Sequence, residues 1–213
     1  MLHLSGTSLL AVLSCAILGW AQKDHARNPQ LTVFVYNRAE VSQVMLEQAE
    51  RDAARVFAGC DLDTAWVNCP PGAASPACVH PPAAFHATIR LIARPLSLPD
   101  AAFGVAFLSD DRGAYADVFF EHVKRLGGDD QHVDLAAVLG HVMAHEIGHL
   151  LLGSHSHSPS GIMQGQWHED QLVKISQGRL LFTAEQAGQM RTQVASWARA
   201  FSSSPGRAEI RGQ

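Results

Sequence analysis

The first half of the chain alternates short β-type runs with one stretch of helical periodicity. Residues 31–36 read L-T-V-F-V-Y, and their β-branched and aromatic side chains predict a strand. Apolar residues recur at helical spacing over 39–57, which predicts a helix. Two further strands are expected, a short one at 65–67 and one at 85–92, where apolar and polar residues alternate as in a half-buried strand.

Two more β-type segments, 104–108 and 114–123, flank a turn at 109–113 that holds two aspartates and a glycine. Segments separated in this way pair most simply as a hairpin. Together with the earlier runs they predict a mixed, twisted sheet of about four or five strands.

The second half of the pattern is helical. Asp134 is the expected N-cap of a long apolar helix over 135–152, and Gly153 stands where a left-handed residue ends a helix. A final helix is expected from Thr183 to about Phe201. The order of elements therefore predicts an α+β fold.

The two ends of the chain differ from this core. Residues 9–20 form an apolar run of the length of a signal-peptide core, and Gly19 and Ala21 supply small residues before a cut. We therefore expect a signal peptide over 1–21, one domain over 30–201 and a disordered tail over 202–213. This organisation predicts a secreted or periplasmic protein without a stable membrane span.

Composition narrows the range of partners. Hydrophobic residues make up 47% of the 213 positions and charged residues 17%, which is enough apolar material for one buried core. The net charge is −4, and the 16 lysines and arginines form no basic stripe. Nucleic acid is therefore not an expected partner. The oligomeric state is not indicated by the sequence.

The exported chain would keep three cysteines, which allows one disulfide. We expect the bond between Cys69 and Cys78, because the segment between them holds three prolines and a glycine and must loop. Closing such a short loop stabilises a fold by about 2–3 kcal/mol. Cys60 is then expected to be a buried free thiol.

The candidate chemistry is concentrated in H-E-I-G-H, residues 145–149. Residues four apart on a helix lie one turn above each other, so His145 and His149 can offer two imidazoles to one metal ion while Glu146 lies beside it. A catalytic zinc site needs a third protein ligand and an open position for water. His155 and His157 follow closely and are the candidates for that third ligand.

These residues resemble the signature of the metzincin zinc metallopeptidases, H-E-x-x-H-x-x-G-x-x-H followed by a turn that bears a methionine. His145, Glu146, His149 and His155 fall on the motif, and Met163 in G-I-M matches the methionine turn. His155-Ser156 further resembles the matrixin branch. The chain also resembles small secreted bacterial proteins that carry H-E-I-G-H-L-L-L-G and then a single H-S, here at His157-Ser158.

The third ligand stays open between two histidines. Strict motif spacing favours His155. The motif's glycine position holds Leu152, however, and Gly153 comes one residue later. A later turn, together with the second resemblance, favours a later ligand, His157. His141, one helical turn before the motif, is expected to be a core residue or to support the site without binding the metal.

The resemblance implies a zincin-like fold with an active-site helix and a C-terminal helix, and a secreted zinc-dependent endopeptidase. In this reading Zn²⁺ is the cofactor, a peptide or protein is the substrate, and Glu146 is the general base for a metal-bound water. Met163 would form the hydrophobic floor of the site, and the substrate would pair with an edge strand within 114–119. The alternative is a catalytically inactive zincin-like protein that binds zinc.

Overall fold

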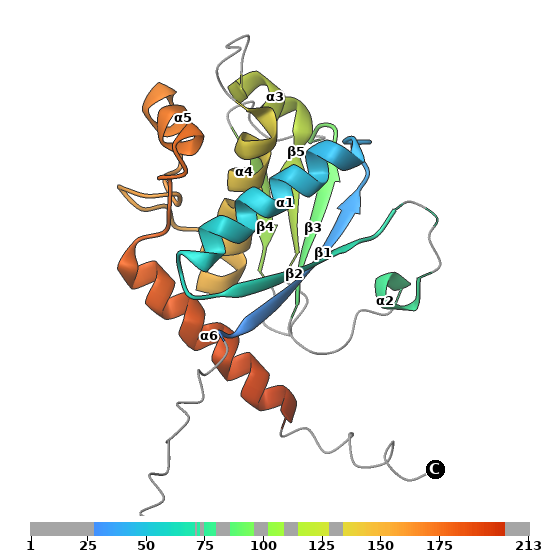
Figure 1. The fold of residues 1–213 in the computed structure, drawn as a ribbon, viewed down its shortest axis with the longest axis vertical. Helices are drawn as coiled ribbons and strands as arrows, with labels where there is room; N and C mark the ends of the chain where they lie inside the picture. Colours follow the sequence, from blue (N-terminus) through green and yellow to red (C-terminus); the bar gives the residue numbers. More distant parts are fainter. Residues whose placement is uncertain are drawn as a thin grey trace, which may run out of the picture.

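The computed structural model describes residues 28–70, 72, 75–79, 86–95, 102–108, 115–127 and 134–202 (Figure 1). The expected signal peptide lies outside these residues, as does the expected tail apart from Ser202. The elements are β1 (Gln30–Asn37), α1 (Gln43–Ala58), β2 (Asp63–Asn68), α2 (Pro76–Val79), β3 (His86–Ile92), β4 (Gly104–Phe107), β5 (Tyr115–Phe119), α3 (Phe120–Gly127), α4 (Leu135–Leu152), α5 (Glu169–Ser176) and α6 (Ala184–Ser202).

The five strands form one mixed sheet in the order β2-β1-β3-β5-β4. Neighbouring strands are parallel except for β4, which is antiparallel to β5 and forms one edge. The predicted α+β class, with a mixed sheet of four or five strands, is confirmed.

One face of the sheet is largely apolar at its centre. Val33 on β1 is paired with Ala87 on β3, and Ile89, further along β3, is paired with Ala116 on β5. All four are buried, and α1 and α4 lie over this part of the sheet (Figure 1). Side chains alternate across a strand, so the intervening residues lie on the opposite face. Burial between helices and sheet is the main source of stability for such a layered fold.

Helix α4 is the centre of the structure and begins and ends where its local signals predict. The Asp134 side chain accepts a hydrogen bond from the Ala136 N–H, and Gly153 ends the helix with φ 62° and ψ 31°. α1 crosses α4 closely at Gly140, where an added β-carbon would overlap the backbone oxygen of Ala49. This close crossing fixes the helix that carries the H-E-I-G-H motif.

Three sequence expectations need correction. The β-type run 114–123 ends as a strand at Phe119 and continues as helix α3, whose amphipathic pattern places Val123 in the core. The short helices α2 and α5 lie where only loops were expected. The expected edge strand within 114–119 is interior, because β5 lies between β3 and β4; the edge is β4.

The expected disulfide is present. Cys69 follows β2 and bonds Cys78 in α2, with the two Cα atoms 5.7 Å apart. The remaining cysteine of the described residues, Cys60, is buried and free, and burial raises its pKa to about 11. A structural disulfide is typical of a compartment outside the cytoplasm.

Among the described helices, α4 is long and apolar enough to cross a membrane by length and composition. However, 83% of it is buried inside the protein. Its apolar character is that of the central helix of a packed core.

Candidate metal centre

The last turns of α4 bring the motif residues together. His145 and His149 are one turn apart and buried, and Glu146 lies between them in sequence with only 4% of its surface exposed. Burying three polar side chains in one helix is costly unless each has a partner. The partners therefore indicate what the site can do.

Both buried histidines have their ring orientation fixed by a backbone carbonyl. His145 Nδ1 lies 2.7 Å from the Ile162 oxygen, and His149 Nδ1 lies 2.7 Å from the Ser154 oxygen. A carbonyl only accepts, so each Nδ1 carries the proton. Burial lowers the pKa of His145 to about 3 and also lowers the pKa of His149, so both rings are neutral at neutral pH.

The two Nε2 atoms then carry lone pairs, and they lie 3.1 Å apart. Neither can donate to the other, so the contact is repulsive unless a cation binds both nitrogens. One zinc ion at about 2.0–2.1 Å from each nitrogen fits this separation. A ligand histidine that donates its other N–H to a carbonyl is also the usual arrangement around zinc.

A third imidazole joins this pair. Ligand atoms of His145, His149 and His157 all lie within 4.8 Å of one another, and the group could hold a metal ion. The ring centre of His157 is 5.4 Å from that of His145 and 5.0 Å from that of His149. His155 is farther away, with 6.4 Å between its ring centre and that of His149, and it is not part of the three-histidine group.

The chain reaches His157 through the turn at Gly153. The left-handed conformation of Gly153 ends α4, and its N–H bonds the His149 carbonyl. The Ser154 carbonyl then holds His149, so the start of this loop is fixed to the site itself. The Ser158 N–H bonds the Met163 carbonyl at 2.9 Å, which anchors the other end of the loop.

Met163 lies beneath the helix. It is fully buried, and a β-carbon on Gly148 would be 2.7 Å from its sulfur. Gly148 lies between the two buried histidines, so its missing side chain lets the methionine turn pack against α4. The neighbouring Ile162 carbonyl is the group that orients His145.

Glu146 points toward the edge strand. A β-carbon on Gly104 of β4 would be 2.6 Å from the Glu146 carboxylate, and Glu146 Oε2 has no hydrogen-bond partner among the described residues. Burial, with a smaller contribution from the charge of Asp117, raises the pKa of Glu146 to about 8. A carboxyl poised near neutral pH suits proton transfer in both directions.

A cleft of about 110 Å³ lies between β4 and the motif. His145, Glu146 and His157 line it together with Phe103, Gly104, Gln164 and Trp167. Phe103, Gly104, Gln164 and Trp167 belong to no motif that would single them out in the sequence. The indole of Trp167 lies edge-on to the His145 ring, with 5.7 Å between ring centres. No sequence signal connects these distant residues.

Comparison with known proteins adds a structural likeness but no sequence family. No protein-family model matches the chain, and no curated protein matches it. Among solved structures, the chain is similar to the crystal structure of metalloproteinase-II from Bacteroides fragilis, with a TM-score of 0.48 and 12% identity. The similarity covers 78% of this chain and 53% of that one, so the chain spans about half the length of its neighbour.

Proposed function

We propose that the protein is a secreted zinc-dependent endopeptidase of the metzincin type. The observation that carries this proposal is the convergence of His145, His149 and His157, with the buried carboxyl of Glu146 directly beside them. Three imidazoles and an adjacent carboxyl are the donor set and base of a zinc hydrolase.

In this proposal His145, His149 and His157 hold the zinc, and His155 lines the loop. Zinc bound there would supply a Lewis acid that polarises the scissile carbonyl and increases the acidity of water. Both buried ligands are already held in the required tautomer by the carbonyls of Ile162 and Ser154. Little reorganisation is therefore needed on metal binding.

Glu146 is the proposed general base. Its carboxylate would take a proton from the attacking water and then deliver it to the leaving amine. The small residue at Gly104 leaves room for this carboxyl against the edge strand. Met163 would support the site from below through packing alone.

The substrate would lie as an extended peptide along β4. This strand pairs with β5 on one side, and no other described strand pairs with it. An exposed strand edge binds an extended peptide through backbone hydrogen bonds. Gly104, at the start of β4, lines the cleft, so the bound backbone would pass beside Glu146. The disulfide supports a secreted or periplasmic location.

The test is peptide cleavage by the zinc-reconstituted protein on a diverse peptide library, with products identified by mass spectrometry. Glu146→Gln should retain about one zinc per chain and lose roughly 10²-fold or more in cleavage rate. Glu47→Gln, on the exposed side of α1, is the matched control and should keep full activity. Stoichiometric zinc without cleavage of any peptide would instead support a catalytically inactive zinc-binding protein.

A further inference from the structure

The third imidazole of the candidate metal centre rests on a glycine of the loop that follows it. His157 is exposed and comes from a loop, whereas His145 and His149 are buried in α4. A β-carbon on Gly165 would lie 2.9 Å from His157 Nδ1 and 3.0 Å from its Cγ. The ring therefore lies directly against the backbone of residue 165, and the position of that backbone limits where the imidazole can lie.

Three hydrogen bonds connect the residue before this glycine to helix α5. Gln171 Oε1 accepts from the His168 N–H at 2.8 Å, and Gln171 Nε2 donates to Gln164 Oε1 at 3.2 Å. Gln164 Nε2 in turn donates to the Pro159 carbonyl at 3.1 Å. Pro159 is two residues after His157, so this series of bonds runs from the first turn of α5 into the loop that carries the third ligand.

The direction of every bond in the series is fixed by the first one. A backbone N–H can only donate, so the Gln171 atom that faces it must be the oxygen. The amide nitrogen of Gln171 then faces Gln164, whose oxygen accepts, and the Gln164 nitrogen is left for the Pro159 carbonyl. A residue at position 171 that has no donor for Gln164 would therefore break the series at both later bonds.

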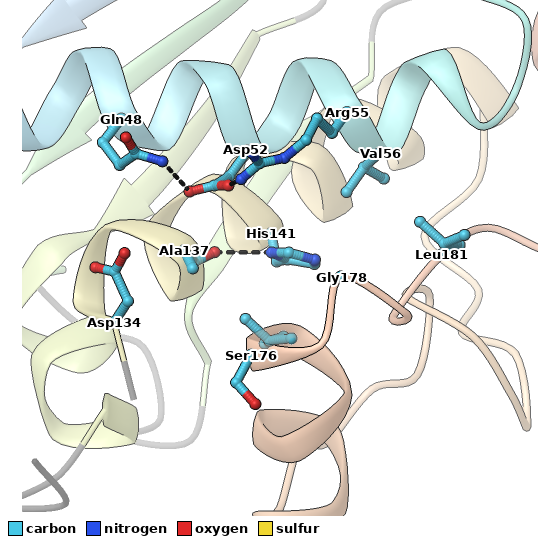
Figure 2. A pocket seen from close by; sticks show the side chains of 11 residues that line it. Gln48, Asp52, Arg55, Val56, Asp134, Ala137, His141, Ser176, Gly178 and Leu181 are labelled. Atoms are coloured by element: carbon cyan, nitrogen blue, oxygen red, sulfur yellow. Dashed lines mark hydrogen bonds and ion pairs between the residues drawn. The ribbon is translucent and has the colours of Figure 1, made fainter. Parts of the chain in front are cut away.

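Two residues of α5 are buried, and they are held in different ways. Ile175, in the last turn, lines a cavity of about 440 Å³ between α5, α4 and α1, so its packing is incomplete. His141, which is buried and is not part of the three-histidine group, lines the same cavity from α4 (Figure 2). Gln171, in the first turn, has both the oxygen and the nitrogen of its amide hydrogen-bonded. The first turn is therefore the end of α5 that specific polar contacts fix, and these contacts lead to the loop of His157.

We propose that Gln171 is a positioning residue for the third ligand: through Gln164 it holds residues 159–165 where the His157 ring reaches the metal. The inference rests on the proposed zinc site and adds a link between α5 and the metal-binding loop. Gln171 contacts neither the metal nor the substrate in this arrangement and acts only through its neighbours.

The test variant is Gln171→Glu. Glutamate has nearly the same shape and keeps an oxygen for the His168 N–H, but its carboxylate has no donor for Gln164. Zinc affinity, measured by competition with a chromophoric chelator, should fall about three- to ten-fold, the effect of one lost hydrogen bond. In the zinc-free protein the ring nitrogen and carbon resonances of His157 should shift, and those of the buried His145 should shift far less.

Gln186→Glu is the matched control, because Gln186 has the same place at the start of α6. Its Oε1 accepts from the Thr183 N–H at 2.9 Å, as Gln171 Oε1 does from the His168 N–H in α5. Helix α6 contributes no histidine to the three-histidine group. This variant should bind zinc as the unmodified protein does and should leave the His157 resonances in place.

A double-mutant cycle separates the proposed role from a general loss of structure. Gln164→Ala removes the middle of the series and should weaken zinc binding by a similar factor. In that background Gln171→Glu should have little further effect on zinc affinity, because the series is already broken. Gln164 is only partly buried in a loop, so Gln164→Ala also keeps the test valid if Gln171→Glu fails to fold.

The outcomes are distinguishable. Unchanged zinc affinity and unchanged His157 resonances in Gln171→Glu would overturn the inference and leave the proposed zinc site intact. Effects that multiply in the double variant, or an equal loss in Gln186→Glu, would contradict it by showing general destabilisation. Failure of the unmodified protein to bind zinc would contradict the proposed function, and the His157 resonances of the zinc-free protein would still decide whether Gln171 positions this ring.

Discussion

Gly104 on the edge strand and Glu146 on the central helix are in direct contact: a β-carbon at position 104 would lie 2.6 Å from the carboxylate of Glu146 and 2.6 Å from the backbone oxygen of Asp117. The carboxylate of Glu146, the candidate base, therefore packs directly against the backbone of β4, the candidate substrate-binding strand. A side chain at 104 would need space that both the sheet and the carboxyl already occupy.

Gly104→Ala should therefore displace Glu146 and reduce peptide cleavage by roughly ten- to a hundred-fold, because small misplacements of a catalytic group have large effects. Zinc content should remain about one per chain, which separates this effect from loss of the metal site. The matched control is Gly188→Ala, where an added β-carbon meets only the end of Arg191 at 3.9 Å. Full activity in Gly104→Ala would show that Glu146 is not held by this contact.

The third ligand can be assigned by two single substitutions. His157→Ala should lower zinc affinity by a factor of about 10² or more, since it leaves two imidazoles for the metal. His155→Ala should change it little, because His155 lies outside the three-histidine group. Zinc affinity is measured by competition with a chromophoric chelator. A greater loss of zinc affinity in His155→Ala would mean that His155 is the third ligand, at the strict spacing of the motif.

The sequence predicted best where local signals decide the structure. Helix α4 could be delimited to the residue, because Asp134 and Gly153 act on their immediate neighbours. The strand within 114–123 was only half right, because aromatic and β-branched residues at 118–123 suit a strand as well as the first turn of α3. Which strand forms the edge depends on pairing between distant segments, and no local pattern encodes that order.

The same distinction holds for the candidate site. Helical periodicity alone brings His145, Glu146 and His149 together, so these residues could be named from spacing. Gly104 and Trp167 come from β4 and from the loop before α5, and only the packed fold places them in the cleft. A glycine or tryptophan outside a motif has no spacing rule that would single it out.

Glu50 provides a test of pH dependence away from the metal centre. It is buried in α1, and burial raises its pKa, so the folded protein favours the neutral acid. The unfolded chain ionises first as pH rises above about 4.5, and the folded state therefore loses stability from that pH upward. Glu50→Gln should stabilise the protein at pH 8 and have little effect at pH 4, as measured by urea unfolding of the apoprotein. A benefit that does not grow with pH would contradict this assignment.

The turn at Gly153 should control both stability and the metal. Its φ of 62° is unfavourable for a residue with a side chain, although an added β-carbon would meet no atom within 4 Å. Gly153→Ala should therefore cost about 1 kcal/mol of stability from backbone conformation alone, and Gly153→Asn less, because asparagine adopts this conformation more readily. Gly178→Ala is the matched control, since Gly178 has φ 64° and equally open surroundings.

The two glycines should differ in their effect on zinc. Gly153 begins the loop in which the Ser154 carbonyl orients His149 and which leads to His157, so a shifted turn displaces two of the three proposed ligands. Zinc affinity should fall in the order glycine, asparagine, alanine at position 153, and should not change in Gly178→Ala. If all four proteins bind zinc equally, the loop adopts its conformation without needing glycine at position 153. The one-residue shift of this glycine would then not explain why His157 is the third ligand.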